Sequence, residues 1–395
     1  MEKLKKNLWI MKAISKQSLS TQKEIISRLL NSKKKYVKGG GKADVDNILK
    51  CTLCPNMCRF ACPVSVAGKS EMYSPSGRAT IAYLYEREWY MDKDSIDLIY
   101  ACGSCSGCEQ WCPFGFSVED LLIGVREELV DKNRVPTYLM RTRDNLVKNH
   151  TLYQDGVKSL ETRTSKGETL FFSGCTTLNK TQNIAHATLK ILDKAEVEYD
   201  TLDEEWCCGA PLSILGFMED FKKFMKHNKQ ILNDYKTLIC SCPTCAYTFK
   251  EVYRQHGYPI NIEVLHTSEY YLRLVKEGKI KFKQSNMEIV YHDPCVLARK
   301  MNCIQEPREL MNNIPGLTIK EPQNKGNKTW CCGKGGMLGI TNPYLSKEIT
   351  SKRVTELKAE SNTIISACPI CKLTLQEDQD IEVMDISEIL AKHIA

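Results

Sequence analysis

The sequence predicts an α+β multidomain protein, in which an N-terminal α-helical domain precedes two tandem α/β repeats. Two runs of four cysteines, each closed by Cys-Pro, lie early in the chain among helical patterns. A five-cysteine pattern that includes Cys-Cys-Gly then occurs twice. Short apolar segments alternate with helical patterns throughout this second part, which is typical of α/β units with parallel strands.

The composition narrows the class of protein. The 395-residue chain is 42% hydrophobic and contains 20 cysteines. No apolar stretch approaches the roughly 18 residues that span a membrane, and charges interrupt the N-terminus too often for a signal peptide. We therefore expect a cytoplasmic protein, in which clustered cysteines are metal ligands or redox centres rather than disulfides.

Residues 1–44 are predicted to form a basic arm. Residues 1–50 hold 13 Lys or Arg against 4 Asp or Glu. The arm is either a solvated segment or a docking site for an acidic partner or the cytoplasmic face of an anionic membrane, while nucleic acid is not expected because no reading motif accompanies the charge. A helix is predicted over Gln22 to Asn31, followed by a flexible joint formed by Lys33 to Lys38 and Gly39-Gly40-Gly41.

The helical domain predicted over residues 45–135 contains the two cysteine runs. These are Cys51, Cys54, Cys58 and Cys62, and then Cys102, Cys105, Cys108 and Cys112. In two-cluster ferredoxins the fourth cysteine of each run binds the cluster of the other run. The pattern therefore predicts one [4Fe–4S] cluster on Cys51, Cys54, Cys58 and Cys112, and another on Cys102, Cys105, Cys108 and Cys62.

Structural zinc is the alternative, but zinc sites take two pairs of ligands rather than a repeated four-cysteine run. The first run carries one extra residue before Cys58, which is the weaker point of the assignment.

Helices are predicted over Ser76 to Tyr85 and Val118 to Val130, with Ile96 to Tyr100 leading into the second run. Residues 136–168 are predicted to be a linker.

The two repeats are predicted over residues 169–285 and 286–395. Their five-cysteine sets are Cys175, Cys207, Cys208, Cys242 and Cys245, and Cys295, Cys331, Cys332, Cys368 and Cys371. The expected strands are Leu170 to Phe172, Leu238-Ile239, Ile262 to Leu265, Ile289 to Tyr291, Ile364-Ile365 and Ile381 to Met384. The cysteines fall at strand ends and helix starts, where ligand sites of α/β units gather and where the thiolate form is favoured.

From these motifs the chain resembles the heterodisulfide reductases, and among their polypeptides the D subunit. Its layout is also similar to the iron–sulfur subunits of anaerobic glycerol-3-phosphate dehydrogenase and glycolate oxidase. The resemblance covers roughly residues 45–395 and is carried by the cysteine motifs together with Tyr291 to Cys295, Glu306 to Leu310, Ile314 to Leu317 and Cys331 to Gly336. It implies that each five-cysteine set holds a non-cubane [4Fe–4S] cluster, with the disulfide substrate cleaved between the two.

The resemblance leaves several residues without a role. Cys240 and Cys303 are interpreted as spare or buried thiols. His292 is either a structural histidine or a proton donor to a leaving thiolate, and so a candidate catalytic residue. Lys334 and Arg299 are candidates to attract an anionic substrate.

Two functions follow. The favoured one is an oxidoreductase subunit that passes electrons between the ferredoxin-type clusters and the Cys-Cys-Gly clusters, reducing a disulfide or oxidising thiols. The alternative is a non-catalytic electron-transfer subunit of a flavin-dependent glycerol-3-phosphate or hydroxy-acid dehydrogenase, delivering electrons towards quinone. No Gly-rich dinucleotide fingerprint is present, which predicts a partner subunit that is a flavoprotein, a membrane cytochrome or both.

Overall fold

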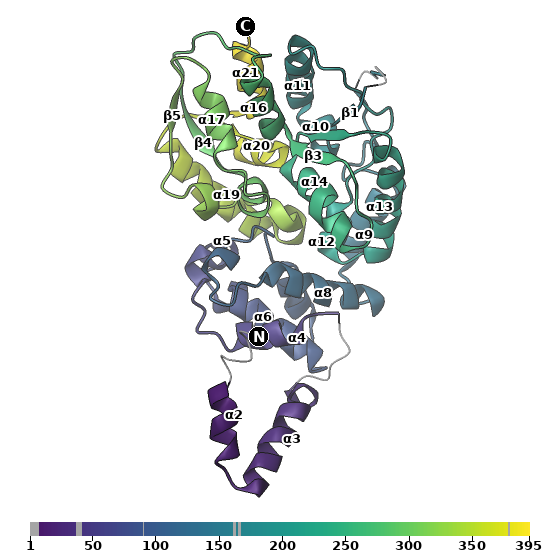
Figure 1. Ribbon diagram of the computed structural model, residues 1–395, viewed down its shortest axis with the longest axis vertical. Coiled ribbons are helices and arrows are strands. Elements are labelled where there is room, and N and C mark those ends of the chain that lie inside the picture. Colours follow the sequence, from purple (N-terminus) through teal and green to yellow (C-terminus); the bar gives the residue numbers. More distant parts are fainter. Residues whose placement is uncertain (1–7, 37–41, 90, 161–162, 165–166, 378–379) are drawn as a thin grey trace.

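The computed structural model describes residues 8–36, 42–89, 91–160, 163–164, 167–377 and 380–395. From the N-terminus these residues form a helical hairpin, a helical domain and two α/β domains that lie side by side at the far end of the molecule (Figure 1). The predicted flexible joint is wrong over Lys33 to Tyr36, which are helical. The rest of the joint, residues 37–41, lies outside the described residues, as do residues 1–7 of the arm.

The hairpin consists of α2 (Leu8–Ser15) and α3 (Leu19–Tyr36), which project from the helical domain (Figure 1). Helix α3 begins earlier and ends later than the predicted helix over Gln22 to Asn31. Its lysine-rich end contains no Pro or Gly, so nothing in the sequence stops the helix there. In the part of the chain that the structure describes, no helix combines the length and apolarity that crossing a bilayer requires.

The helical domain contains the main helices α4 (Val45–Thr52), α5 (Pro63–Gly68), α6 (Pro75–Glu86), α7 (Lys93–Tyr100) and α8 (Val118–Asp131). Asp44, Ser74, Asp92 and Ser117 cap α4, α6, α7 and α8 by accepting a hydrogen bond from a backbone N–H, as short polar side chains do at helix starts. Ile48, Ile99, Leu122 and Val125 are fully buried between these helices. The predicted approach to the second run is thus the last part of a complete helix, α7.

The segment expected as a linker contains a helix, α9 (Thr137–Asn149). Leu139 and Leu146, seven residues apart on one face, are fully buried against the core shared by the helical domain and the first α/β domain. The remainder of residues 136–168 is without regular structure where it is described.

Each α/β domain has a small parallel sheet. In the first, the order is β1 (Thr169–Phe172), β2 (Thr237–Cys240) and β3 (Glu263–His266). In the second, the order is β5 (Thr318–Lys320), β4 (Glu288–His292), β6 (Thr363–Ser366) and β7 (Glu382–Asp385). The six expected strands and their parallel pairing are confirmed. Strand β5 was not expected; the corresponding position of the first repeat forms only a single bridge, between Leu170 and Asp200.

Helices cover these sheets. The first domain has α10 (Cys175–Lys180), α11 (Gln182–Lys194), α12 (Ala210–Leu215), α13 (Met218–Leu232), α14 (Pro243–Tyr247), α15 (Tyr253–Gln255) and α16 (Thr267–Lys276). The second has α17 (Glu306–Asn312), α18 (Leu338–Thr341), α19 (Pro343–Lys358), α20 (Pro369–Leu375) and α21 (Ile386–His393). Buried Tyr271 of α16 joins the domains, because its hydroxyl donates to Thr188 of α11 at 2.9 Å and to Ser387 of α21 at 3.2 Å.

The helical domain is tied to both α/β domains. Arg126 of α8 is fully buried and donates to the carbonyl of Ile99 and, at 2.7 Å, to that of Ile214 in the first α/β domain. Helix α5 packs against α19 of the second. The strand ends that carry the cysteines are therefore held close to the two cysteine runs.

Candidate iron–sulfur sites and the cavity between the domains

The two cysteine runs line two adjacent small cavities in the helical domain. One cavity is lined by Cys51, Cys54, Cys58, Cys108 and Cys112. The other is lined by Cys62, Cys102, Cys105 and Cys108. The last cysteine of each run thus faces the cavity of the other run, and this grouping supports the crossed assignment of ligands.

The thiols of these runs are crowded and largely buried. Burial and neighbouring thiols raise the pKa of Cys51 to about 12 and that of Cys58 to about 11. Fully buried Arg78 donates to the Cys62 sulfur at 3.2 Å and to the Ala101 carbonyl at 2.5 Å. Such sulfurs ionise only when a positive charge compensates them, and the iron of a cluster supplies that charge. The donor set therefore fits an iron–sulfur cluster.

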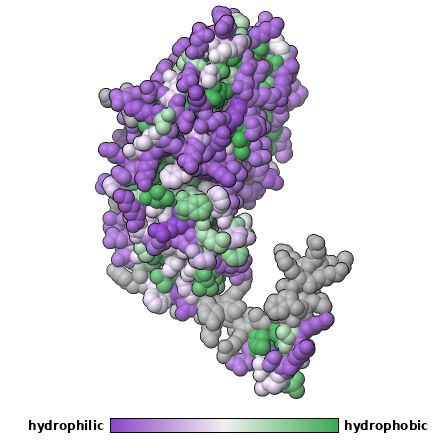
Figure 2. All heavy atoms as spheres, turned by 90° about the vertical axis from the view of Figure 1, so that its left-hand side faces the viewer, coloured by the Kyte–Doolittle hydropathy of each residue, from purple (hydrophilic) through white to green (hydrophobic). Residues whose placement is uncertain are grey.

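The first of these cavities lies near the protein surface. Cys54, Cys58 and Cys112 are partly exposed, and large apolar side chains beside them are exposed as well. These are Leu53, Met57, Phe60, Trp111 and Phe114. Figure 2 shows apolar side chains gathered over the surface between the hairpin and the α/β domains, whereas the α/β domains are mainly hydrophilic on this face.

The first five-cysteine set lies at the carboxyl ends of β1 and β2. Cys175 begins α10 directly after β1, and its sulfur is 3.8 Å from that of Cys207. Cys242 precedes α14 directly after β2, and Cys245 lies in the first turn of that helix. Gly209 ends the Cys-Cys-Gly motif at a φ of +83°, and a side chain there would meet the Phe221 ring at 2.8 Å, so both backbone and space require glycine.

The second set is arranged in the same way. Cys295 follows β4, and Cys368 and Cys371 follow β6 around the start of α20. Gly333 has a φ of +113°, and a Cβ atom there would lie 2.5 Å from Thr350 Oγ1. The same constraint, a positive φ with no room for a Cβ atom, therefore requires glycine in both copies of the motif. Among the described residues, no group of three or more Cys, His, Asp or Glu side chains is arranged to hold a metal ion. The thiols of each set instead contact one another in sequence: Cys208 meets both Cys207 and Cys245, and Cys332 meets both Cys331 and Cys371.

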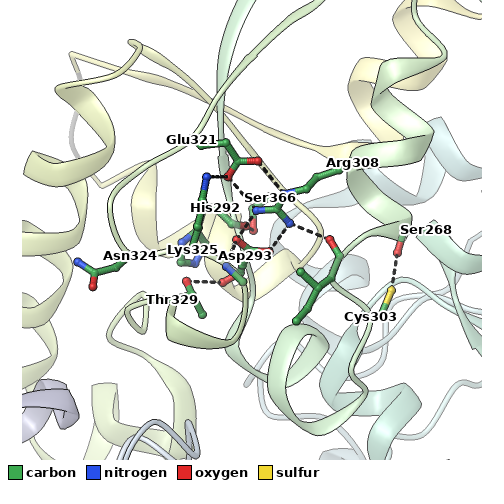
Figure 3. Close-up of polar contacts among 12 residues, drawn as sticks. Ser268, His292, Asp293, Cys303, Arg308, Glu321, Asn324, Lys325, Thr329 and Ser366 are labelled. Atoms are coloured by element: carbon green, nitrogen blue, oxygen red, sulfur yellow. Dashed lines mark hydrogen bonds and ion pairs between the residues drawn. The ribbon is translucent and has the colours of Figure 1, made fainter. Parts of the chain in front are cut away.

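A polar network fixes the loop that carries Cys295. Arg308 donates to both carboxylate oxygens of Asp293 at 2.8 Å and to Glu321 at 2.7 Å (Figure 3). The Asp293 carboxylate also accepts from the Gly326 N–H at 2.8 Å, and its backbone carbonyl accepts from Thr329. Bidentate arginine–carboxylate pairs are geometrically specific, so this network orients the chain just before Pro294 and Cys295. From sequence, Arg308 is recognisable only as part of a motif and has no predicted role.

His292 lies in the interior behind the second set. It is fully buried at the end of β4, and its Nδ1 atom accepts a hydrogen bond of 3.0 Å from Arg353. Its other face contacts the Cys332 thiol, and burial lowers the pKa of the imidazole. The three domains enclose a cavity, which is described below, and His292 is not among the described residues that line it. This position supports a structural or tuning role over proton donation to a substrate.

Thiol contacts link the sites in a fixed order. The Cys105 thiol of the helical domain is hydrogen-bonded to Cys331 of the second set, and this contact and Arg299 lower the pKa of Cys105 to about 5. The Cys368 thiol of the second set is in turn hydrogen-bonded to Cys242 of the first set. The second set is thus placed between the helical domain and the first set.

A cavity of about 350 Å³ opens where the three domains meet. All five cysteines of the first set line it, whereas Cys295 is the one member of the second set among its described lining residues. All five cysteines of the second set, Cys295 included, belong to a buried cluster with Cys105. The first set therefore faces open space, and the second set is enclosed.

The remaining candidates have internal partners. The Arg299 guanidinium donates to the carbonyls of Cys105 and Thr329, and Lys334 is paired with Glu377. Cys240 is fully buried in β2, and Cys303 is buried with its sulfur 3.9 Å from the Ser268 hydroxyl. Burial raises the pKa of both thiols, as expected for unreactive cysteines.

Family comparisons agree with this domain order. Residues 47–116 match the 4Fe-4S dicluster domain, and residues 169–250 and 289–376 each match the cysteine-rich domain. The D subunit of the dihydromethanophenazine:CoB–CoM heterodisulfide reductase of Methanosarcina mazei is 29% identical over 318 residues, which cover 75% of this chain and 78% of the relative. The chain thus combines a 4Fe-4S dicluster domain with two cysteine-rich domains, and it is similar to the D subunits of heterodisulfide reductases. It is an electron-transfer protein of the oxidoreductase type, with iron–sulfur clusters as its cofactors.

Other relatives of the chain are subunits of different redox enzymes. The B subunit of the fumarate reductase (CoM/CoB) of Methanothermobacter marburgensis is 29% identical over 304 residues, or 74% of this chain and 61% of the relative. The EtfAB:quinone oxidoreductase of Syntrophomonas wolfei is 25% identical over 345 residues, or 78% of this chain and 48% of the relative. The chain therefore spans about half to three quarters of the length of these relatives.

Proposed function

We propose that this protein is the disulfide-handling subunit of a redox complex, with four [4Fe–4S] clusters. Two are bound by the crossed cysteine runs and two, of non-cubane type, by the five-cysteine sets. The observation that carries the proposal is the cavity between the domains, because it brings the complete first set to a space large enough for a small disulfide. Iron–sulfur clusters supply one-electron transfer when they are bound, and successive transfers reduce a disulfide.

The order of thiol contacts supports an order of sites along the internal electron path. The half-exposed cavity of Cys54, Cys58 and Cys112 is the accessible end, and the apolar surface beside it fits contact with a redox partner. The path then continues through the second cavity, across Cys105 and Cys331, and from Cys368 to Cys242. The enclosed second set acts as a relay, and the first set acts on substrate. The same path serves thiol oxidation in reverse.

The partner is expected to be a flavoprotein, a membrane cytochrome or both. The projecting hairpin supports peripheral attachment to an acidic partner or the cytoplasmic face of an anionic membrane. It carries exposed Lys12, Lys16 and Lys23 together with exposed Leu19 and Ile26, a combination of charge and apolar surface that suits either.

A second function is favoured by the similarity to EtfAB:quinone oxidoreductase. In that case the chain is a non-catalytic conduit, which carries electrons from a flavin-dependent dehydrogenase of glycerol 3-phosphate or a hydroxy acid towards quinone. The half-exposed first cavity supports this function equally well. The large cavity at the first set has no role in it.

Iron, acid-labile sulfide and zinc per chain, measured on protein purified without oxygen, test the cofactor assignment. About sixteen iron per chain is expected for four clusters, and about eight would leave the five-cysteine sets empty and favour the conduit. A colourless protein with zinc would contradict both functions. Reduction of a disulfide by the full-iron protein, with reduced viologen as electron donor, then separates the two.

A further inference from the structure

Helix α6 places a charged side chain at the second of the two cavities that the cysteine runs line. Ser74 caps this helix by accepting a hydrogen bond from the Gly77 N–H at 3.0 Å. A Cβ atom at Gly77 would lie 2.2 Å from the backbone carbonyl oxygen of Glu71, so this close approach of the two segments requires glycine. Arg78 follows, is buried, and lines the cavity together with Cys62 and cysteines of the second run. The start of α6 therefore fixes the place of the Arg78 guanidinium.

Arg78 connects the two cysteine runs. Its Nη2 atom donates to the Cys62 sulfur at 3.2 Å, and its Nη1 atom donates to the Ala101 carbonyl at 2.5 Å. Cys62 ends the first run, and Ala101 directly precedes Cys102, the first cysteine of the second run. The N–H groups of a guanidinium have fixed relative directions. One side chain therefore holds Cys62 in place beside the run whose cluster it is assigned to bind.

The positive charge of Arg78 has no carboxylate partner among the described residues, because its hydrogen bonds go to two carbonyls and a sulfur. Glu109 and Glu119 line the same cavity, but neither forms an ion pair with Arg78, and Glu119 lies 2.7 Å from Lys300 instead. Burying a guanidinium without a compensating anion is costly. A cluster held by four thiolates carries a net negative charge, so it compensates this guanidinium when it is bound.

Two further guanidiniums lie near the second run, but they contact the backbone instead of a sulfur. Arg126 donates to two carbonyls, and Arg299 donates to three. Of the arginines that the structure describes, Arg78 alone donates to a cysteine sulfur. The first cavity, in contrast, has no Lys, Arg, Asp or Glu among its described lining residues. A guanidinium therefore acts directly on a ligand at the second cavity but not at the first.

On the basis of the proposed function and its clusters, we propose that Arg78 positions Cys62 and raises the reduction potential of the inner cluster, which is the one assigned to Cys102, Cys105, Cys108 and Cys62. Reduction moves one electron from the cluster of the first cavity to the inner cluster, breaks no bond and moves no proton. It makes the inner cluster more negative, so the adjacent guanidinium stabilises the reduced form more than the oxidised form. The hydrogen bond to the Cys62 sulfur acts in the same direction. Arg78 therefore favours the inward electron step of the proposed path.

Potentiometric titration of the full chain, followed by paramagnetic resonance and accompanied by iron analysis, tests the role of Arg78. Arg78→Gln keeps a hydrogen-bond donor and removes the charge. It should lower the equilibrium constant for reduction of the inner cluster about tenfold, a shift of about 59 mV for one electron, and leave the other potentials in place. Arg78→Lys keeps the charge and should lie closer to the unmodified protein. Arg141→Gln removes an exposed arginine of α9 and should change no potential.

Two outcomes of this titration would overturn the proposal. One is an unchanged potential of the inner cluster in Arg78→Gln. The other is an equal shift in the lysine and glutamine variants, because a role that depends only on packing does not distinguish a charged from a neutral side chain.

A second measurement uses the unmodified protein and decides the question if the Arg78 variants lose iron. Arginine labelled with a heavy nitrogen isotope in the guanidinium should change the pulsed paramagnetic resonance signal of the reduced inner cluster, because Nη2 contacts a ligand sulfur. The absence of any coupling to the label would overturn the proposal. A protein with about eight iron per chain and no disulfide reduction would contradict the proposed function, yet both measurements would still test Arg78. A protein without iron would overturn both together.

Discussion

Arg353 donates a hydrogen bond of 3.0 Å from Nε to Nδ1 of His292, and both side chains are fully buried beside the second five-cysteine set. An arginine can only donate, so Nδ1 is the acceptor and the ring proton resides on Nε2. Nε2 has no oxygen or nitrogen partner among the described residues, and the ring contacts the Cys332 thiol. His292 is thereby held as a neutral hydrogen-bond donor towards Cys332, which we propose as a cluster ligand.

The first repeat lacks this donor, because Phe172 occupies the position that His292 has in the second. His292→Phe should lower the reduction potential of the second-set cluster by about 60 mV, since losing roughly 1.4 kcal/mol of stabilisation of the reduced form corresponds to that shift. Potentiometric titration followed by paramagnetic resonance measures it. His292→Gln, which keeps a donor, serves as the control, and an unchanged potential in His292→Phe would rule out the tuning role.

Two neighbouring glycines allow the second domain to approach the ferredoxin runs. A Cβ atom at Gly336 would lie 2.3 Å from the Cys102 carbonyl, and one at Gly335 would lie 2.5 Å from that of Gly103. Gly336→Ala should therefore push the two loops apart and slow electron transfer from the ferredoxin clusters to the five-cysteine sets by about tenfold or more, as small misplacements at reacting sites do. Stopped-flow absorbance after mixing with reduced viologen measures this rate.

Gly339→Ala is the matched control, because its new methyl group would meet only the flexible Lys334 side chain, at 3.3 Å. It should transfer electrons at the normal rate. If both variants were slowed equally, the contact between Cys105 and Cys331 would not be the limiting step.

The ligand assignment predicts which cysteines carry iron. Cys175→Ala should lower the iron content by about four atoms per chain, the content of one cluster. Cys303→Ala and Cys240→Ala should leave it unchanged, because both thiols are buried away from the cavities and have no proposed ligand role. Loss of iron in either of these two would mean that the sets are larger than the repeated motif indicates.

The buried carboxyl of Asp385 should make the free energy of unfolding depend on pH. It caps α21 by accepting from the Ser387 N–H at 2.8 Å, and burial raises the pKa of its carboxyl to about 7. The folded protein therefore binds one more proton than the unfolded chain between about pH 4 and 7, so this residue makes stability fall as pH rises through that window. Asp385→Asn keeps the cap and removes the titration. Its denaturation midpoint should rise relative to that of the unmodified protein on going from pH 5 to pH 8, and parallel curves would refute the argument.

Much of this organisation was predictable because the decisive residues are local. Strands such as Leu170 to Phe172 are short apolar runs, and the repeat with an offset of 120 residues fixes where each cysteine follows its strand. Strand β5 was not predicted, because Thr318–Lys320 is short and at most partly buried, so its apolar signal is weak. Helix α9 was not predicted, because mainly polar residues separate Leu139 from Leu146.

Long-range relations could not be predicted in this way. Arg78 lies in a helix that precedes the second run, and its contact with Cys62 depends on how that helix packs. The same holds for Arg353, which reaches His292 across 61 positions of sequence. The contacts of Cys105 with Cys331 and of Cys242 with Cys368 depend on the relative placement of whole domains, about which spacing within each motif says nothing.

The enclosed position of the second set also constrains how the protein is built in the cell. All five of its cysteines are packed in one buried cluster with Cys105 of the helical domain, and α5 packs against α19. Scaffold proteins that deliver preformed clusters need direct access to the receiving thiols. We therefore expect maturation to be ordered: this cluster is inserted while the helical domain is still undocked, and docking then seals it from oxidants that would dismantle it.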